Sequence, residues 1–172
     1  RQTMLFSATM PSDISRLARE ILNDPVRVEV SPRTITVEKV DQRVFFVDTG
    51  NKRALLAHLL RDAGMSRVIV FMRTKRGASR LAMQLEKSGI STESIHGDKA
   101  QNARQSALAR FRNGHARVLV ATDVAARGID ISGVTHVVNY ELPNIPESYV
   151  HRVGRTARAG AEGVALSFCD AS

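Results

Sequence analysis

The sequence predicts an α/β fold with three layers, in which a mostly parallel sheet lies between helices. From about residue 67 onward, short β-branched runs alternate with amphipathic stretches of helical length. Continuous apolar runs suit strands that are buried on both faces, which is typical of a parallel sheet. Consecutive parallel strands need crossover connections, and right-handed crossovers through helices cover the faces of the sheet.

Six runs are candidate strands, and three stretches between them have the apolar periodicity of helices. The expected strands are residues 44–47, 67–71, 91–95, 117–121, 135–139 and 163–168. The expected helices are residues 51–61, 75–87 and 101–111. The second helix shows the pattern clearly, because Ala78, Leu81, Ala82 and Leu85 recur on one side of it.

The first 33 residues do not fit this alternation. Residues 4–6 predict a strand, and Pro11 opens a helix that Asp24-Pro25 ends. Residues 34–43 are charged and polar without helical periodicity, so we interpret them as a linker to a domain at 44–172. We expect residues 1–33 to be the tail of a preceding domain. The alternative is that they form an edge strand and a helix of the same domain.

The expected N-terminal helix has one apolar face, formed by Ile14, Leu17, Ile21 and Leu22. If its own domain is missing, this face has nothing to pack against. We therefore expect the helix to be mobile, or to self-associate with a neighbouring chain through residues 12–22.

Composition favours a polyanion as the partner. The 25 Lys and Arg against 17 Asp and Glu give a net charge of +8, which points to nucleic acid. Aromatic residues make up 5% and tryptophan is absent, so base stacking is not expected as the main mode of contact. We expect the nucleic-acid backbone to be gripped rather than the bases read.

The cysteine content bounds the compartment and the metal chemistry. Cys169 is the only cysteine, which excludes an intramolecular disulfide and fits a reducing, cytoplasmic location. It has no accompanying Cys or His ligands, so we expect no metal site in this chain. The longest aliphatic runs, such as residues 68–72, are too short to span a bilayer, and the N-terminus has no signal-peptide pattern.

Polar clusters follow four of the expected strands. They are Arg73-Thr74-Lys75, His96-Gly97-Asp98, Thr122-Asp123 with residues 126–130, and Tyr140-Glu141-Leu142-Pro143. Ligands of open α/β sheets bind beyond the carboxyl ends of the strands, so we expect these clusters on one edge of the sheet. The basic members suit phosphates; these are Arg73, Lys75, Arg104, Arg127 and the arginines of residues 152–158. Asp123 and Asp130 can accept hydrogen bonds from ribose hydroxyls or hold arginines in place.

A basic segment at residues 151–158 follows the last of these clusters. If the region is helical, His151, Arg155 and Arg158 fall at i, i+4 and i+7 on one face. Guanidinium groups in a row suit the phosphates of a nucleotide. The alternative is a solvated basic face without a ligand.

Taken in order, these segments resemble the DEAD-box family of ATP-dependent RNA helicases over essentially the whole chain. Six stretches carry the resemblance to the motifs that the family numbers III, IV, IVa, V, Va and VI: Ser7-Ala8-Thr9, residues 70–74, Gly97 with Gln101 and Arg104, residues 122–130, residues 138–143 and residues 151–158. The sequence of residues 151–160 is most similar to that of the bacterial RhlE-type branch. The resemblance implies a RecA-like C-terminal domain.

The resemblance implies a role for individual residues at the nucleotide. Arg155 and Arg158 would be arginine fingers that reach the γ-phosphate of ATP, a contribution of about 10³–10⁵ in rate in other phosphoryl-transfer enzymes. Asp130 would bind the ribose, and Arg127 with Gly128 would complete the ATP contact. His151 would act beside the fingers.

The resemblance also implies residues that contact RNA and residues that couple two domains. The RNA backbone would be lined by Thr74, Gly97, Gln101, Arg104 and Thr122. Ser7, Thr9 and His151 would couple ATP hydrolysis to domain closure. Less specific interpretations stay open, because Gln101 and Arg104 are common on helix surfaces and Ser7 and Thr9 are ordinary helix caps. Gly128 is equally a turn residue, and Asp130 a cap.

The sequence departs from the family at two positions and lacks two of its motifs. Ala157 replaces a common glycine, with little effect expected from one methyl group, and Glu141 replaces a common aspartate. No phosphate loop and no Asp-Glu-Ala-Asp box occur. We therefore expect the ATP-gripping residues and the Mg²⁺ ligands in an N-terminal domain, and no efficient ATP hydrolysis by this chain alone. The competing hypotheses are a non-catalytic binding module and a DNA helicase or translocase.

Overall fold

The computed structural model describes residues 2–7, 10, 12–29, 40–126, 131–157 and 162–170. The chain divides into two compact units, Arg1–Pro32 and Arg33–Ser172, which are described separately. Within the described residues, no helix is both long and apolar enough to cross a membrane.

The smaller unit contains one helix, α1 (Ser12–Ile21). Ala18 is buried, whereas the side chains of Leu17 and Ile21 on the expected apolar face are 44% and 50% exposed. The strand predicted at residues 4–6 is absent; these residues have no regular structure. A strand is held by the ladder of hydrogen bonds to a neighbour, and the described part of this unit provides no second strand.

The larger unit contains a six-stranded sheet in the order β1-β6-β5-β2-β4-β3. Its strands are β1 (Val40–Phe46), β2 (Val68–Met72), β3 (Thr92–Ile95), β4 (Val118–Thr122), β5 (His136–Asn139) and β6 (Gly163–Cys169). Every neighbouring pair is parallel, which confirms the predicted sheet. Strand β1 starts earlier than predicted, so residues 40–43 belong to the sheet and not to the linker.

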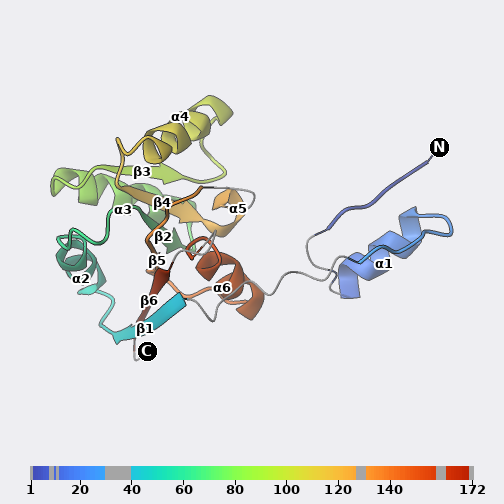
Figure 1. The fold of residues 1–172 in the computed structure, drawn as a ribbon, viewed down its shortest axis with the longest axis horizontal. Helices are drawn as coiled ribbons and strands as arrows, with labels where there is room; N and C mark the ends of the chain where they lie inside the picture. The colour runs from blue at the N-terminus through green and yellow to red at the C-terminus, as the bar shows by residue number, and fades with distance from the viewer. Residues whose placement is uncertain are drawn as a thin grey trace. The chain divides into compact units, whose positions relative to one another are not determined.

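Helices cover both faces of this sheet (Figure 1). The helices are α2 (Lys52–Leu59), α3 (Lys75–Lys87), α4 (Gln101–Arg112), α5 (Asp123–Ala126) and α6 (Pro146–Val153). Alternate side chains of β2 separate the layers: Val68 and Val70 pack with α2 and α3, whereas Ile69 and Phe71 pack with α4 and α5. Helix α6 packs through Val153 against the neighbouring strands β1 and β6. The fold is therefore the three-layer α/β architecture that the sequence predicts.

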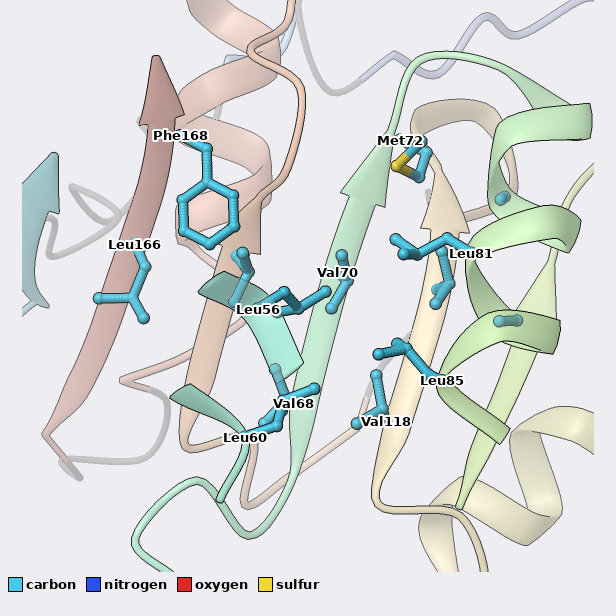
Figure 2. Close-up of a cluster of buried hydrophobic side chains, with 14 of the residues drawn as sticks. Leu56, Leu60, Val68, Val70, Met72, Leu81, Leu85, Val118, Leu166 and Phe168 are labelled. Atoms are coloured by element: carbon cyan, nitrogen blue, oxygen red, sulfur yellow. The ribbon is translucent and has the colours of Figure 1, made fainter. Parts of the chain in front are cut away.

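The core under α3 shows how the apolar pattern of the sequence becomes packing (Figure 2). Leu81 and Leu85 point from α3 toward Val70 and Val118 on the neighbouring strands β2 and β4. All four are at most 3% exposed. Burial of one such side chain contributes roughly 1.5–3 kcal/mol, so this layer fixes α3 firmly against the sheet. The loops at the ends of β2, β3 and β4 are thereby placed on a rigid support.

Candidate functional site

The polar clusters of the sequence lie at the carboxyl ends of the strands. Since all six strands are parallel, these ends share one edge of the sheet, as predicted. Arg73, Thr74 and Lys75 follow β2 directly, and His96-Gly97-Asp98 follows β3. Thr122 ends β4, and Tyr140-Glu141 follows β5. Ligands of open α/β sheets usually bind at this location, beyond the carboxyl ends of the strands.

Arg152 joins the loops at the centre of this edge. Its side chain is 1% exposed and pairs with Asp123 in a bidentate geometry, Nε to Oδ1 at 2.6 Å and Nη2 to Oδ2 at 2.8 Å. Its Nη1 donates to the carbonyl of Glu141 at 2.6 Å and to Oδ1 of Asn139 at 3.2 Å. The guanidinium also lies 5.0 Å from the ring centroid of Phe71. One buried arginine therefore holds together the ends of β2, β4 and β5.

This position of Arg152 corrects the interpretation that all arginines of segment 151–158 suit phosphates. The donors of Arg152 are used inside the protein, and Asp123 serves the second of its two predicted uses, holding an arginine in place. The sequence contains a signal for this burial. Tyr149, Arg152, Val153 and Thr156 recur at helical spacing, and the last three are buried.

Glu141 makes a second connection along the edge. Its Oε2 accepts a hydrogen bond from the backbone N–H of Arg73 at 2.7 Å and lies 4.0 Å from Nε of the same residue. The carboxylate thus links the ends of β2 and β5. The longer side chain that stands here in place of aspartate is accommodated in this contact.

The basic segment is only partly helical. Helix α6 ends at Val153, so Arg155 lies in the turn that follows, and the predicted helical face does not continue from His151 to Arg155. Nε of Arg155 donates to the carbonyl of His151 at 3.1 Å. Both residues are half-buried, and Arg158 lies outside the described residues. The turn keeps Arg155 and His151 adjacent without a helix.

Thr156 anchors this turn on the far side of Arg155. The residue is 3% exposed, and its Oγ1 donates to the carbonyl of Val134 at 2.6 Å. Gly163 starts β6 so close to it that an added Cβ would lie 2.6 Å from the backbone nitrogen of Ala157. Glycine is therefore required at position 163 by the approach of the two backbones.

Ala157 has a φ of 54°, which corrects the expectation that its methyl group has little effect. This left-handed conformation favours glycine, and an L-residue with a Cβ has a steric cost there of roughly 1–2 kcal/mol. The chain thus accepts local strain next to Thr156.

The five residues that we expect to contact RNA lie at or just after the carboxyl ends of β2, β3 and β4. Thr74 is exposed, and its hydroxyl caps α3 by accepting a hydrogen bond from the N–H of Gly77 at 3.1 Å. Gly97 is exposed in the loop after β3. Thr122 is only 6% exposed, so its side chain offers little surface. Both side chains therefore also serve the fold: Thr74 caps α3, and Thr122 is buried at the end of β4.

Gln101 and Arg104 lie together in the first turn of α4. Nη1 of Arg104 donates to Oε1 of Gln101 at 3.2 Å. Nε of Arg104 is buried and has no hydrogen-bond partner among the described residues. A buried donor without an acceptor is uncommon and costs stability, so the described residues do not fully satisfy this guanidinium.

The other predicted site residues fall outside this description of the edge. Ser7 is exposed and belongs to the smaller unit. Outside the described residues are Thr9, Arg127, Gly128, Asp130 and Arg158. Across the residues that are described, no three His, Cys, Asp or Glu side chains are grouped as metal ligands.

Comparison with known proteins places these features in a family. The family described as "Helicase conserved C-terminal domain" matches residues 51–160. The chain is 50% identical over 168 residues to the DEAD-box ATP-dependent RNA helicase CshA of Geobacillus kaustophilus, and 45% identical over 168 residues to the ATP-dependent RNA helicase RhlB of Pseudomonas syringae pv. tomato. Each match covers 98% of this chain, which spans only 36% and 42% of the two relatives.

Solved structures with the same fold come from related proteins. S. cerevisiae Dbp5, bound to RNA and ADP BeF3, superimposes with a TM-score of 0.79 at 32% identity, covering 97% of this chain and 44% of Dbp5. The E. coli DEAD-box protein SrmB, bound to regulator of ribonuclease activity A, gives a TM-score of 0.72 at 43% identity, covering 76% of this chain and 77% of that one. These matches confirm the RecA-like fold.

Proposed function

Because the chain belongs to the helicase conserved C-terminal domain family, in its DEAD-box branch, we propose that it is the C-terminal half of an ATP-dependent RNA helicase. In this role it supplies arginines to ATP and one side of an RNA-binding cleft. An N-terminal RecA-like domain of the same protein supplies the other side. ATP and RNA together close the two domains and unwind a short duplex or remodel an RNA–protein complex, and hydrolysis restores the open state.

The observation that carries this proposal is the anchoring of the segment that holds Arg155. Arg152 and Thr156 are both buried and hydrogen-bonded on either side of it. An arginine that stabilises a phosphoryl-transfer transition state must be held in place before the reaction. The two anchors fix the backbone from which Arg155 and His151 extend, so that little ordering remains when ATP arrives.

The nucleotide is bound mainly by residues outside this sequence, which has no phosphate loop. ATP with Mg²⁺ fits a site shared between the two domains, where the metal ion neutralises charge on the phosphates. On this side we assign Arg155 and Arg158 to the γ-phosphate, Asp130 to the ribose, and Arg127 with Gly128 to the rest of the contact. His151 couples this site to Ser7 and Thr9.

The RNA backbone follows the ends of β2, β3 and β4. The exposed positions of Thr74 and Gly97 and the paired side chains of Gln101 and Arg104 support this path. The guanidinium of the half-buried Arg104 lies beside the exposed Gln101, and a phosphate oxygen is a suitable acceptor for this group. Thr122 contributes through its backbone, since its side chain is buried. The RhlE-type branch, cytoplasmic location and self-association through residues 12–22 stay predictions.

The test uses the full-length protein that contains this chain, with ATP turnover measured with and without single-stranded RNA. We expect RNA-stimulated turnover, and a loss of about 10³-fold or more in Arg155→Ala. Arg53→Ala, an exposed arginine on α2, is the matched control and should keep wild-type turnover. Turnover without RNA stimulation, or turnover indifferent to Arg155, would favour a non-catalytic binding module.

A further inference from the structure

A hollow of about 440 Å³ lies between helix α3 and the loop that follows β3. Lys75, Arg76, Arg80 and Met83 of α3 line it, together with His96 and Asp98. We call this feature the α3 groove. Ser79 of α3 completes the lining; three of these seven side chains are cationic and one is a carboxylate, so the groove is positively charged.

The single carboxylate is already neutralised inside the groove. Nζ of Lys75 lies 2.5 Å from Oδ1 of Asp98, and this contact holds the pKa of Asp98 below its ordinary value. The two charges cancel, and Arg76 and Arg80 remain. They are separated by one helical turn and both are exposed. Among the described residues, neither has an ion-pair partner within 4.0 Å.

The floor of the groove is fixed and neutral. His96 is 7% exposed, and its Nε2 lies 2.7 Å from Oγ of Ser79. Burial is the main cause that lowers the pKa of His96, and the neighbouring Lys99 lowers it further. The imidazole therefore adds no charge at neutral pH. The attraction for an anion comes from the two arginines, while Met83, which is 53% exposed, adds an apolar surface.

The groove is continuous with the residues that we assign to RNA. Lys75 follows Thr74 in the chain, and Asp98 follows Gly97. A Cβ added at Gly97 would lie 3.4 Å from Cε of Lys75, so the loop and the helix are in contact at the mouth of the groove. A strand of RNA at Thr74 and Gly97 can therefore continue past Arg76 and Arg80 without leaving the surface.

We propose that the α3 groove binds the phosphodiester backbone of RNA nucleotides that flank those held at the strand ends. Arg76 and Arg80 each contact a phosphate, and Met83 packs against a sugar or base. This inference rests on the proposed function and extends the RNA path beyond the six motifs. An acidic protein segment fits the charge less well, because the regular spacing of the two arginines and their place beside Thr74 match a polymer already bound there.

The test compares RNA strands of two lengths, about 6 and about 12 nucleotides, since single-strand sites span about 4–16 nucleotides. Binding of fluorescent strands to this chain is measured by anisotropy over a range of salt concentrations. The groove variant is Arg76→Gln with Arg80→Gln. The matched control removes two exposed arginines elsewhere, Arg53→Gln with Arg61→Gln.

For the groove variant we expect roughly five- to tenfold weaker binding of the longer strand and little change for the shorter one. The salt slope of the longer strand should shrink by about 1.4, because each single-strand phosphate contact contributes about 0.7. The control should leave both strands and both slopes close to wild type.

Arg104→Gln separates this inference from the proposed function. If Arg104→Gln weakens both strands while the groove variant binds the longer strand as wild type does, the inference fails and the proposed RNA path stands. If neither variant affects either strand, both fail. A groove variant that loses binding of a polyglutamate peptide but keeps its affinity for RNA would overturn the RNA assignment in favour of an acidic protein partner.

Discussion

Two parts of the sheet edge formed by the carboxyl ends of the strands, its centre and the α3 groove beside β3, use arginine in opposite ways. At the centre, Arg152 is 1% exposed, and its guanidinium is hydrogen-bonded to Asp123, Asn139 and Glu141. In the α3 groove, Arg76 and Arg80 are exposed and have no ion-pair partner in the described part of the chain. The same side chain therefore serves as scaffold where its donors are satisfied and as a binding group where they are not.

The difference shows that charge alone does not identify a ligand site. Burial and satisfied donors decide whether an arginine is available, and neither can be judged from a run of basic letters. His151 and Arg155 are half-buried, between the two extremes, and they are the residues that we propose act at ATP.

The largest expected effect is the loss of the central arginine. Arg152→Ala leaves the Asp123 carboxylate without its partner, and removal of one member of a buried pair costs about 3–5 kcal/mol. Because Asp123 is about a third exposed, we expect about 3 kcal/mol in the free energy of unfolding, measured by urea denaturation. Arg53→Ala should change this free energy by less than about 0.5 kcal/mol.

Arg152→Lys keeps the charge but not the bidentate geometry, and should fall between these values. If Arg152→Ala does not fold, the stability of Arg152→Lys tests the same prediction. Equal stability of Arg152→Lys, Arg53→Ala and the wild type would show that Arg152 is as dispensable as the exposed Arg53, and the contrast between the centre of the edge and the α3 groove would fail.

A smaller effect is expected at Ala157, in the turn that Thr156 anchors. The φ of 54° places this residue where glycine has no steric cost. Ala157→Gly should therefore raise the free energy of unfolding by about 0.5–1 kcal/mol, less than the full conformational cost because glycine also gains entropy in the unfolded chain. A destabilised Ala157→Gly in the same urea experiment would mean that the turn is not strained.

The smallest effect concerns the floor of the α3 groove and pH. Burial lowers the pKa of His96, so the unfolded chain binds the proton more tightly than the folded chain does. Stability is complete above the ordinary histidine pKa of about 6.5 and declines as the pH falls from there toward the lowered pKa of the folded state. His96→Gln should reduce this decline. His136, whose pKa burial also lowers, keeps its share and serves as the internal comparison.

An NMR titration of the imidazole of His96 gives the pKa directly. A value at or above the ordinary one would show that His96 is charged near neutral pH and that the floor of the groove contributes to its positive potential. The urea midpoint of His96→Gln would then fall with decreasing pH at least as much as that of the wild type.

The sequence was sufficient for the architecture and for the position of the edge. Strands β2 and β4 are continuous apolar runs, and a parallel sheet brings their carboxyl ends together whatever their order. The order itself was not predicted, and the contact of Arg152 with Asp123 depends on it. These two residues are 29 apart in the sequence and meet only because β4 lies beside β2, with β5 on the other side.

Besides the strand order, two local backbone conformations could not be predicted from the sequence. The end of α6 at Val153 and the positive φ of Ala157 follow from the tertiary anchor at Thr156 and the close approach of Gly163. The helical pattern that begins at Pro146 predicts neither the end of α6 nor the φ of Ala157. The strand predicted at residues 4–6 failed for a related reason, since a strand needs a partner that the described part of its unit does not provide.

In the proposed function, the fixed part of the edge serves ATP chemistry and the exposed part serves RNA binding. The most direct test is the RNA dependence of ATP turnover in the full-length protein, with kcat and the RNA concentration at half-stimulation measured for Arg155→Ala and for the groove variant. We predict that Arg155→Ala lowers kcat by about 10³-fold or more with little change in half-stimulation. The groove variant should raise the half-stimulating concentration of long RNA and leave kcat unchanged. A groove variant that lowers kcat, or an Arg155→Ala enzyme that turns over ATP normally at saturating RNA, would contradict this division.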